Sequence, residues 1–403
     1  MLKIIKYLNL NKIGYLEIIL ALYPLMAAYR YGPLFISHIV LLSLDVVLLL
    51  RGKSKFLHFV PLLLFLFYYV FHQIVGVTVF GLTQSYYINT TISSLVFLVS
   101  LFIIVPNINF DKFEGSINWV SIFCLIGLFY HAAIIIGGGT VTPIRIPFLP
   151  EPEGQQSRLF DEMYRPSSFF MEPQSYVSYM LLTLFFAIRN QKYLWVSIVG
   201  ASMILSTSTT GLAVLPIIIF FSITRNNRSK WYSRFVLVLI LVGLTYFLFN
   251  SSWNSFGLNK MENTSLSTNS RTSNGPIMAG MLDFSEYIIG APYANATDLY
   301  KDSFNSNKVA LIVDGNGGVF ISGFWECLIF YGIVGLLIYL SIYWRIWKEN
   351  KEITPLIVCL IVMLFTNPDY IGAWWSFQMT YLLTFVTKKS KVYSNKTVNV
   401  LHA

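Results

Sequence analysis

The chain has 403 residues, of which 55% are hydrophobic and only 12% are charged, and its formal net charge is +9. A soluble domain carries about twice that charged fraction, so the composition excludes an ordinary soluble protein and predicts an all-α, polytopic membrane protein. In a soluble chain the positive charge would indicate nucleic-acid binding. Here the positions of the charges explain the excess, and no nucleic-acid partner is expected.

Apolar runs near the length needed to cross the hydrocarbon core recur along the chain. We expect about twelve transmembrane helices in a single integral membrane domain, residues 1–403, with the first run retained and not cleaved. The seventh and eighth runs are short and meet at a polar turn. The eleventh and twelfth runs also meet at a polar turn, and they alternatively form one broken or re-entrant helix. The predicted spans are 13–29, 34–50, 56–80, 88–105, 117–136, 173–188, 193–206, 210–224, 235–250, 317–343, 354–367 and 371–387.

The basic residues fall mainly in the loops on one side of these spans. Twenty of the 28 Lys and Arg residues lie in segments assigned to the inner side, and eight lie in segments assigned to the outer side. Short basic loops face the cytoplasm, so both termini are expected there. Two long polar segments, 137–172 and 251–316, are then extracytoplasmic loops, and they hold seven of the eight outer basic residues. Connections of this length usually carry function or are disordered, so we expect chemistry on the outer face.

The first long loop meets the next apolar run in a segment that holds two charged residues of opposite sign. Arg165 and Glu172 lie seven residues apart, and each directly precedes a proline. Proline restrains the backbone of the residue before it, and Pro173 suits the first position of a helix. We therefore expect Glu172 at the mouth of that helix, close to the membrane surface. The alternative is a loop-to-helix junction with an ordinary capping carboxylate.

Three further arginines in the outer loops are candidates for binding phosphate or carboxylate groups, which a planar guanidinium contacts with two parallel hydrogen bonds. Arg145 and Arg158 share the first loop with four acidic residues besides Glu172, so internal ion pairs are their alternative. Arg271 begins a short amphipathic run in the second loop, where a cation does not favour the helix dipole. This position favours an external anionic partner, and a solvated surface arginine is the alternative.

Polar groups inside membrane spans are costly and often functional. Asp45 and His72 are expected to satisfy each other or neighbouring helices, and Glu326, near the outer third of its helix, is the strongest functional candidate of this kind. The other polar candidates inside the apolar runs are Glu17 and His131.

Motifs for metal or nucleotide binding are absent from the sequence. There is no Walker loop, no paired-cysteine site and no HExxH motif, and the three cysteines lie in apolar runs and are expected as core residues. The turn of residues 314–318, which begins at Asp314, is too short for a calcium loop and is expected before a helix. No cofactor and no metal is expected.

Three stretches occur in an order found in a known family. The first runs from Arg165 to Pro173 and enters a helix, and the second is Ser206-Thr-Ser-Thr-Thr-Gly211. The third runs from Arg271 through Gly290 to 316–319 and then to Glu326 and the run 331–335, Tyr-Gly-Ile-Val-Gly. In this order and topology, over roughly residues 90 to 390, the chain resembles the bacterial O-antigen polymerase and ligase superfamily, of the Wzy and WaaL type. The family often has Ser-Arg-Gly at the second stretch, and this chain lacks that arginine.

The resemblance implies a metal-independent, GT-C-like glycosyltransferase in the bacterial inner (cytoplasmic) membrane. Its substrates are oligosaccharide repeat units on undecaprenyl pyrophosphate, which it joins into O-antigen, capsular or exopolysaccharide chains. The implied partners are membrane lipid, a chain-length regulator and a repeat-unit flippase. The implied catalytic residues are Glu172, Arg165 and Arg271, and the implied substrate-binding residues are Arg145, Arg158, Glu326 and Asp314.

Two other functions stay open at this point. The ligase branch, which transfers polysaccharide to the lipid A core, carries a functional histidine in its second long loop. This chain has no histidine there, which favours a polymerase, although His131 at a helix end is an alternative source of that group. A flippase or transporter predicts repeated halves and charged residues along a central path. The sequence has few such charges and no clear repeat.

Overall fold

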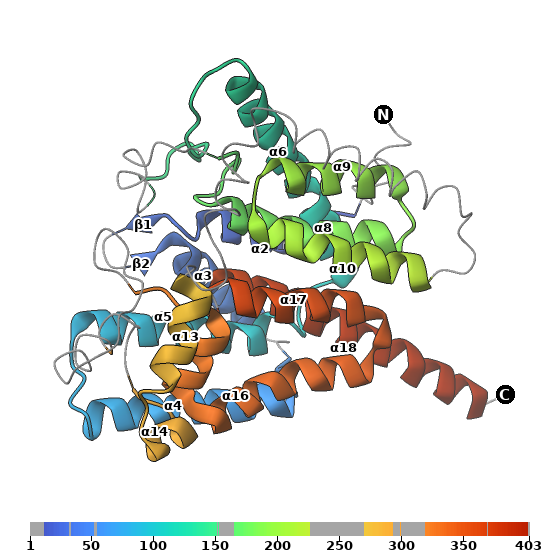
Figure 1. The fold of residues 1–403 in the computed structure, drawn as a ribbon. Coiled ribbons are helices and arrows are strands. Elements are labelled where there is room, and N and C mark those ends of the chain that lie inside the picture. Colours follow the sequence, from blue (N-terminus) through green and yellow to red (C-terminus); the bar gives the residue numbers. More distant parts are fainter. Residues whose placement is uncertain are drawn as a thin grey trace. The chain divides into compact units, whose positions relative to one another are not determined.

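The computed structural model describes residues 12–31, 34–51, 55–150, 152, 165–225, 270–292, 299, 319–368 and 370–401. These residues are mainly helical, with one antiparallel pair of two-residue strands (Figure 1). The chain forms two compact units. Unit 1 consists of residues 1–55, 104–261 and 377–403, and unit 2 consists of residues 56–103 and 262–376.

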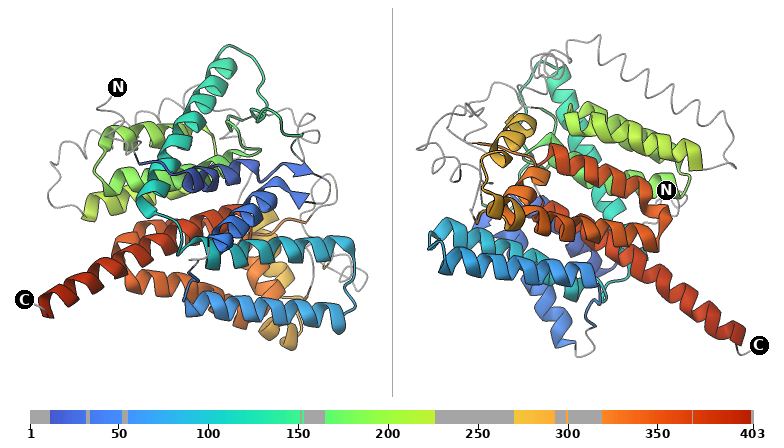
Figure 2. Two further views of the ribbon diagram at one scale, coloured as in Figure 1. Left: turned by 180° about the vertical axis from the view of Figure 1, so that it is seen from behind. Right: turned by 60° about the horizontal axis from the view of Figure 1, so that its bottom comes forward.

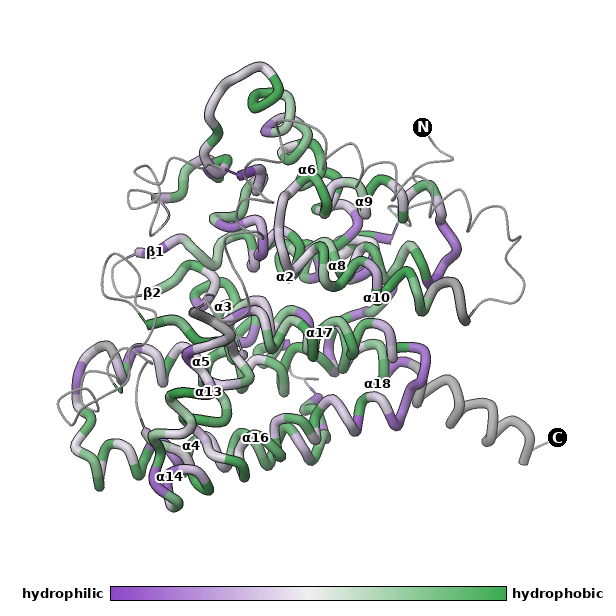
Figure 3. Tube along the Cα trace, in the orientation of Figure 1, coloured by the Kyte–Doolittle hydropathy of each residue, from purple (hydrophilic) through white to green (hydrophobic). Residues whose placement is uncertain are grey.

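Four helices in the described part of the chain are long and apolar enough to cross a membrane: α4 (Val60–Thr78), α5 (Ser85–Ile104), α6 (Phe110–Ile136) and α16 (Gly323–Glu349). Figure 3 shows hydrophobic residues concentrated along the helices and hydrophilic residues at turns such as the one between α8 (Pro173–Arg189) and α9 (Tyr193–Leu205). The remaining apolar helices are shorter. This pattern indicates a helical protein embedded in a membrane.

Eleven of the twelve predicted apolar runs coincide with helical segments, and the run 235–250 lies outside the described residues. The largest correction at a helix start concerns α6, which begins at Phe110 and not at 117. The side chain of Asn109 accepts the backbone N–H of Lys112 and so caps a polar first turn. The last helix, α18 (Ala373–Leu401), continues well beyond the predicted end at 387.

Helix α8 lies at the centre of unit 1. It packs against α6, α9 and α10 (Thr209–Arg225), and α6 also packs against α2 (Tyr15–Leu22) (Figure 1). All residues of α8 from Tyr176 to Ala187 are buried, whichever face of the helix they occupy, as expected of a central helix. Tyr179 of α8 stacks on Phe377 of α18 with ring centroids 5.1 Å apart, and its hydroxyl donates to the carbonyl of Ala21, 2.9 Å away. These contacts hold α8 at a fixed depth and rotation within the unit.

The first helices of unit 1 are joined by a hairpin. The 3₁₀-helix η1 (Tyr23–Met26) follows α2, and the strands β1 (Arg30–Tyr31) and β2 (Leu34–Phe35) pair antiparallel before α3 (Ile36–Leu50). Tyr29, which directly precedes β1, is buried and forms an isolated antiparallel bridge with Pro152. Its hydroxyl accepts the N–H of Ile146, 2.9 Å away. The hairpin therefore anchors the described part of the first long loop.

Helix α16 organises unit 2. It packs against α4, α13 (Ser270–Ala279), α14 (Phe284–Ile289) and α17 (Thr354–Thr366), which follows the 3₁₀-helix η2 (Lys351–Ile353). Figure 2 shows α14 beside α16 in both views. α16 is interrupted at Gly332, whose φ is 65°, and this glycine faces Gly290, whose φ is 92°. A Cβ atom on Gly290 would collide with the carbonyl of Phe330, so this close backbone approach requires glycine.

The break in α16 frees a backbone carbonyl, and a side chain from α4 meets it. The hydroxyl of Tyr68 lies 2.7 Å from the carbonyl oxygen of Tyr331 and 2.8 Å from that of Ile289. Backbone acceptors in an apolar surrounding need a donor, and Tyr68 supplies one at the point where α14 and α16 meet. The side chain of His72, one turn further along α4, packs edge-on against the ring of Tyr331, 5.2 Å away.

Candidate functional site

The first-loop segment 165–172 leads into the N-terminus of α8, as predicted. Glu172 is the N-cap residue with extended backbone (φ −130°, ψ 143°), Pro173 is the first helical residue, and the Glu172 carbonyl accepts the N–H groups of Ser175 and Tyr176. Its carboxylate makes no capping hydrogen bond to the helix. The side chain is half-buried. The interpretation as an ordinary capping carboxylate is therefore wrong: the carboxyl group lies at the helix mouth and does not cap it.

Arg165 connects this segment to the turn between α9 and α10. Its Nη1 donates to the carbonyl oxygen of Thr207, 3.3 Å away, and its side chain is half-buried. Thr207 belongs to the hydroxyl-rich turn 206–211, where Gly211 lies close to Val177 of α8. A guanidinium carries five N–H donors in one plane, and this bond orients that plane at the turn. Two segments 42 residues apart are thereby held together at the mouth of α8.

His131 lies directly behind this segment. It sits near the C-terminal end of α6, is only 1% exposed, and its Nδ1 lies 3.4 Å from the backbone N–H of Ser167, which donates to it. Accepting at Nδ1 requires that this nitrogen carries no proton. The next residue, Ser168, accepts the N–H of Ile144 at its carbonyl, 2.8 Å away, so the start and the end of the first loop meet here. The structure thus places His131 against the Arg165 segment, as the sequence allowed.

The backbone is in an unusual conformation at two positions of this region. Ser168 has φ 58° and Thr207 has φ 54°, both in the left-handed region that non-glycine residues rarely adopt. The hydroxyl oxygens of both residues are buried and have no hydrogen-bond partner among the residues that the structure describes. Such conformations cost energy and gather at functional sites. Neither conformation has a direct signal in the amino-acid sequence.

Two further arginines are placed near the first loop. Arg145 is exposed and directly precedes Ile146, which Tyr29 holds. Arg30 of the hairpin lies over the ring of Phe35, 4.1 Å from its centroid, a contact that fixes the orientation of the guanidinium. The sequence did not single out Arg30, because it lies in a short loop. Arg158 lies outside the described residues.

The other predicted site residues belong to unit 2. Arg271 lies in the first turn of α13, and Glu326 lies half-buried in the first turn of α16. The side chain of Asn274 donates to the carbonyl of Phe320, 3.2 Å away, and Gly275 lies against Trp325. These contacts join the helix that carries Arg271 to the start of the helix that carries Glu326. Asp314 lies outside the described residues.

Two of the buried polar candidates inside the spans, Glu17 and His72, have contacts that fit a structural role. The carboxylate of Glu17 accepts the backbone N–H of Asn109, 2.9 Å away, and so supports the start of α6. In unit 2 the ring of His72 packs on Tyr331. Within the described part of the chain, no three metal-ligating side chains lie together.

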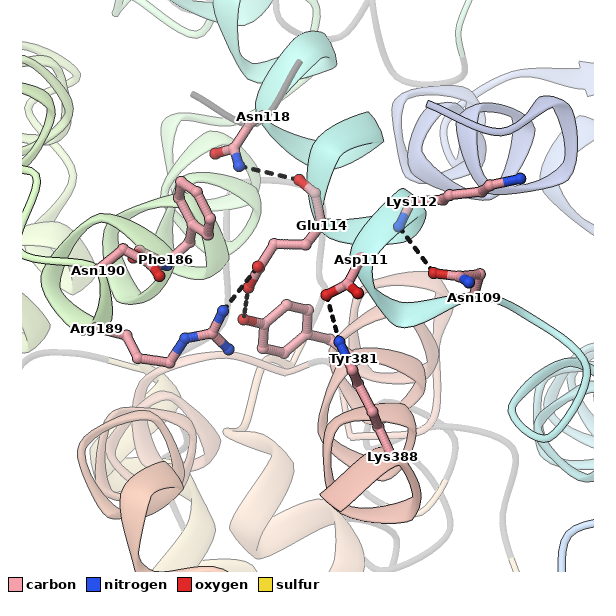
Figure 4. A network of polar contacts seen from close by, with 10 residues as sticks. All are labelled: Asn109, Asp111, Lys112, Glu114, Asn118, Phe186, Arg189, Asn190, Tyr381 and Lys388. Carbon is pink, nitrogen blue, oxygen red and sulfur yellow. Dashed lines mark hydrogen bonds and ion pairs between the residues drawn. The ribbon is translucent and has the colours of Figure 1, made fainter. Parts of the chain in front are cut away.

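Sequence reasoning missed a buried ionic network at the other end of α6 (Figure 4). The carboxylate of Glu114, in a residue only 3% exposed, accepts from Nη2 of Arg189, 2.7 Å away, and from the hydroxyl of Tyr381, 2.8 Å away. One turn earlier, Asp111 pairs with Lys388. Glu114 was missed because the predicted span began after it.

This network gathers three segments that the charge pattern assigned to the inner side: the start of α6, the end of α8 and the C-terminal part of α18. The structure brings these three segments together at one end of unit 1. Burial lowers the pKa of Lys192, in the turn after α8, and the negative charge of Glu114 opposes this decrease. The Arg165 segment, in contrast, lies at the other end of α8.

The comparisons with known proteins found no family model that matches this chain and no match among curated proteins.

Proposed function

We propose that this chain is a polymerase that joins undecaprenyl-pyrophosphate-linked oligosaccharide repeat units into O-antigen, capsular or exopolysaccharide chains. In this proposal it crosses the bacterial inner membrane about twelve times in a GT-C-like arrangement. Both termini face the cytoplasm, and residues 137–172 and 251–316 are extracytoplasmic loops. A repeat-unit flippase supplies the substrate at the outer face, and a chain-length regulator acts on the product.

The observation that carries the proposal is the hydrogen bond from Arg165 to the carbonyl of Thr207. It joins the first and second of the three stretches on which the resemblance to the polymerase family rests. It also holds a permanent cation at the mouth of α8, where the Glu172 carboxylate does not cap the helix. A fixed cation and a carboxylate that does not cap the helix, both at one helix mouth, fit a group transfer from a diphosphate donor.

The proposed reaction uses these two groups in different roles. An acceptor hydroxyl attacks the anomeric carbon of the donor sugar, and the bond from that carbon to the diphosphate oxygen breaks. The electron pair of that bond leaves with the undecaprenyl diphosphate, whose growing charge the arginines stabilise. Glu172 accepts the proton of the attacking hydroxyl. Arg165 serves the leaving group in unit 1 and Arg271 is assigned the same role from α13, while Arg145, Arg158, Glu326 and Asp314 are assigned to sugar and phosphate binding.

Deletion of the gene tests the proposal through the products that accumulate. We expect the ladder of long surface polysaccharide to disappear while single lipid-linked repeat units accumulate, because the units are made but not joined. Gel electrophoresis of surface polysaccharide and mass spectrometry of extracted lipids measure both. Long chains of normal abundance and length in the deletion strain would contradict a polymerase.

A ligase is the second candidate, and the position of His131 favours it, because this histidine contacts the Arg165 segment directly. The same deletion separates the two functions. Loss of a ligase leaves long lipid-linked chains intact and stops only their transfer to the lipid A core. Loss of a polymerase removes the long chains themselves.

The topology makes an independent prediction by cysteine labelling. The native cysteines Cys124, Cys327 and Cys359 are buried, so background labelling is expected to be low. The reagent is a membrane-impermeant maleimide, applied to cells whose outer membrane is permeabilised and whose inner membrane is intact. We expect Phe148→Cys to be labelled, because Phe148 is fully exposed in the first long loop. Lys348→Cys, exposed at the end of α16, should react only after the inner membrane is opened. The reverse pattern would place the proposed site in the cytosol.

A further inference from the structure

Thr207 occupies a backbone position that normally favours glycine. It directly follows Ser206, the C-cap residue of α9, and its N–H donates to the carbonyl of Ile204, 2.9 Å away. Helices commonly end in a left-handed residue at this point, and that residue is usually glycine or asparagine. A β-branched threonine in the left-handed region is a true outlier. The conformation is therefore explained by the helix end, but the choice of residue is not.

Among the described residues of unit 1, Gly138 after α6 has the same helix-end geometry with a glycine, and Gln191 has it with another non-glycine residue, in a different environment. Gln191 ends α8 with φ 56°, and its N–H donates to the carbonyl of Ile188, 3.1 Å away. Its side chain is exposed and it lies at the opposite end of α8 from Arg165. Gln191 thus shows what the backbone position alone requires. It lacks the buried hydroxyl and the arginine contact that distinguish Thr207.

Three properties of Thr207 point to a ligand. Its carbonyl holds Nη1 of Arg165, 3.3 Å away, so its hydroxyl lies on the residue that orients the guanidinium. Its Oγ1 is buried and has no hydrogen-bond partner in the part of the chain that the structure describes. Thr207 itself is half-buried and Thr209 is exposed, so the turn reaches the surface of the unit. A buried hydroxyl left without a partner costs free energy unless another group bonds to it.

From this arrangement we propose that Thr207 is a substrate-binding residue, and that its hydroxyl donates to a phosphate oxygen of the lipid diphosphate that Arg165 holds. This inference rests on the proposed function and adds a second contact to the same site. A guanidinium can only donate and a hydroxyl can donate, so a cation with a hydroxyl on the residue it contacts suits an anion better than an ammonium group. The left-handed threonine is retained because glycine would remove the hydroxyl.

The test measures binding of geranylgeranyl diphosphate to the purified full-length protein in detergent, with geranylgeraniol, which lacks the diphosphate, as the control ligand. Thr207→Ala and Thr207→Gly are expected to raise the dissociation constant for the diphosphate about tenfold to a hundredfold, the usual effect of one hydrogen bond to a charged group. Thr207→Ser keeps the hydroxyl and should bind within about threefold of wild type. Gln191→Gly should bind as wild type.

Thermal unfolding supplies the second readout. Because glycine fits the left-handed position better, both Thr207→Gly and Gln191→Gly should raise the apparent melting temperature, by roughly 1 to 3 °C. Only Thr207→Gly should lose diphosphate binding. Wild-type affinity in Thr207→Ala and Thr207→Gly would overturn the inference.

Arg165→Ala in the same assay separates this inference from the proposed function. If Arg165→Ala loses affinity and the Thr207 variants do not, only the role of Thr207 is wrong. If Arg165→Ala also binds as wild type, the anion site fails and the proposed function loses its main support.

Discussion

Replacing Arg165 by alanine is expected to abolish long polysaccharide chains while the protein remains in the membrane at its normal level. Arg165 supplies the cation that stabilises the departing diphosphate, and removal of one such donor typically costs a factor of about 10² to 10³ in rate. The substitution also removes the bond to the Thr207 carbonyl. Complementation of the deletion strain, followed by a polysaccharide gel and an immunoblot of the membrane fraction, measures both quantities.

The matched control is Arg345→Ala. Arg345 forms a surface ion pair with Glu349 one turn along α16, 2.7 Å apart, with relative exposures of 54% and 32%. Pairs of this kind contribute little to stability, and the residue lies on the predicted inner side. Chain length should therefore stay normal in Arg345→Ala. Arg165→Lys should be impaired as well, because an ammonium group cannot make two parallel bonds to a phosphate. Normal long chains in Arg165→Ala would end the catalytic assignment.

The second large effect concerns stability and comes from the buried network of Figure 4. Arg189→Ala should destabilise the protein by about 3 to 5 kcal/mol, because it leaves the buried carboxylate of Glu114 without its cation. The measurement is the midpoint of thermal or denaturant unfolding of the purified protein in detergent. Adding Glu114→Gln to Arg189→Ala removes the unpaired negative charge, so the double variant should recover most of the lost stability. The glutamine side chain also keeps an acceptor for the Tyr381 hydroxyl.

The chain offers a matched control for this prediction one turn away. Lys388 pairs with Asp111, and both side chains are about two-fifths exposed, at 42% and 40%. Lys388→Ala should therefore cost less than about 1 kcal/mol. An equal loss of stability in Lys388→Ala and Arg189→Ala would mean that burial does not set the strength of these pairs.

The helices could be predicted from the sequence because each apolar run is bounded by charged or turn residues. The start of α6 could not, because its first turn is polar and a search for apolar residues passes over it. What makes that turn helical is the Asn109 cap, and what makes Glu114 tolerable is a pair of partners 75 and 267 residues away. Contacts at such separations have no signature in one sequence.

The candidate site divides in the same way. The segment from Arg165 to Glu172 could be predicted to lead into α8, because the two prolines restrain the local backbone and Pro173 suits the first position of a helix. The bond from Arg165 to Thr207 depends on how α8, α9 and α10 pack, and no local rule indicates it. The left-handed conformation at Thr207 comes from the end of α9, and a threonine at that position does not predict it. His131 was noticed as a buried polar residue, but only the structure gives it a neighbour, Ser167.

The interrupted helix α16 has a consequence for biogenesis. Tyr68, whose hydroxyl meets the carbonyls of Ile289 and Tyr331, is synthesised 221 and 263 residues before them. In hydrocarbon an exposed backbone carbonyl is costly, so the second half of α16 cannot settle beside α14 until α4 is already inserted. Nascent chains released before α16 emerges from the ribosome would carry an α4 that lacks its contacts with α14 and α16, and quality-control proteases of the membrane would meet it in that state.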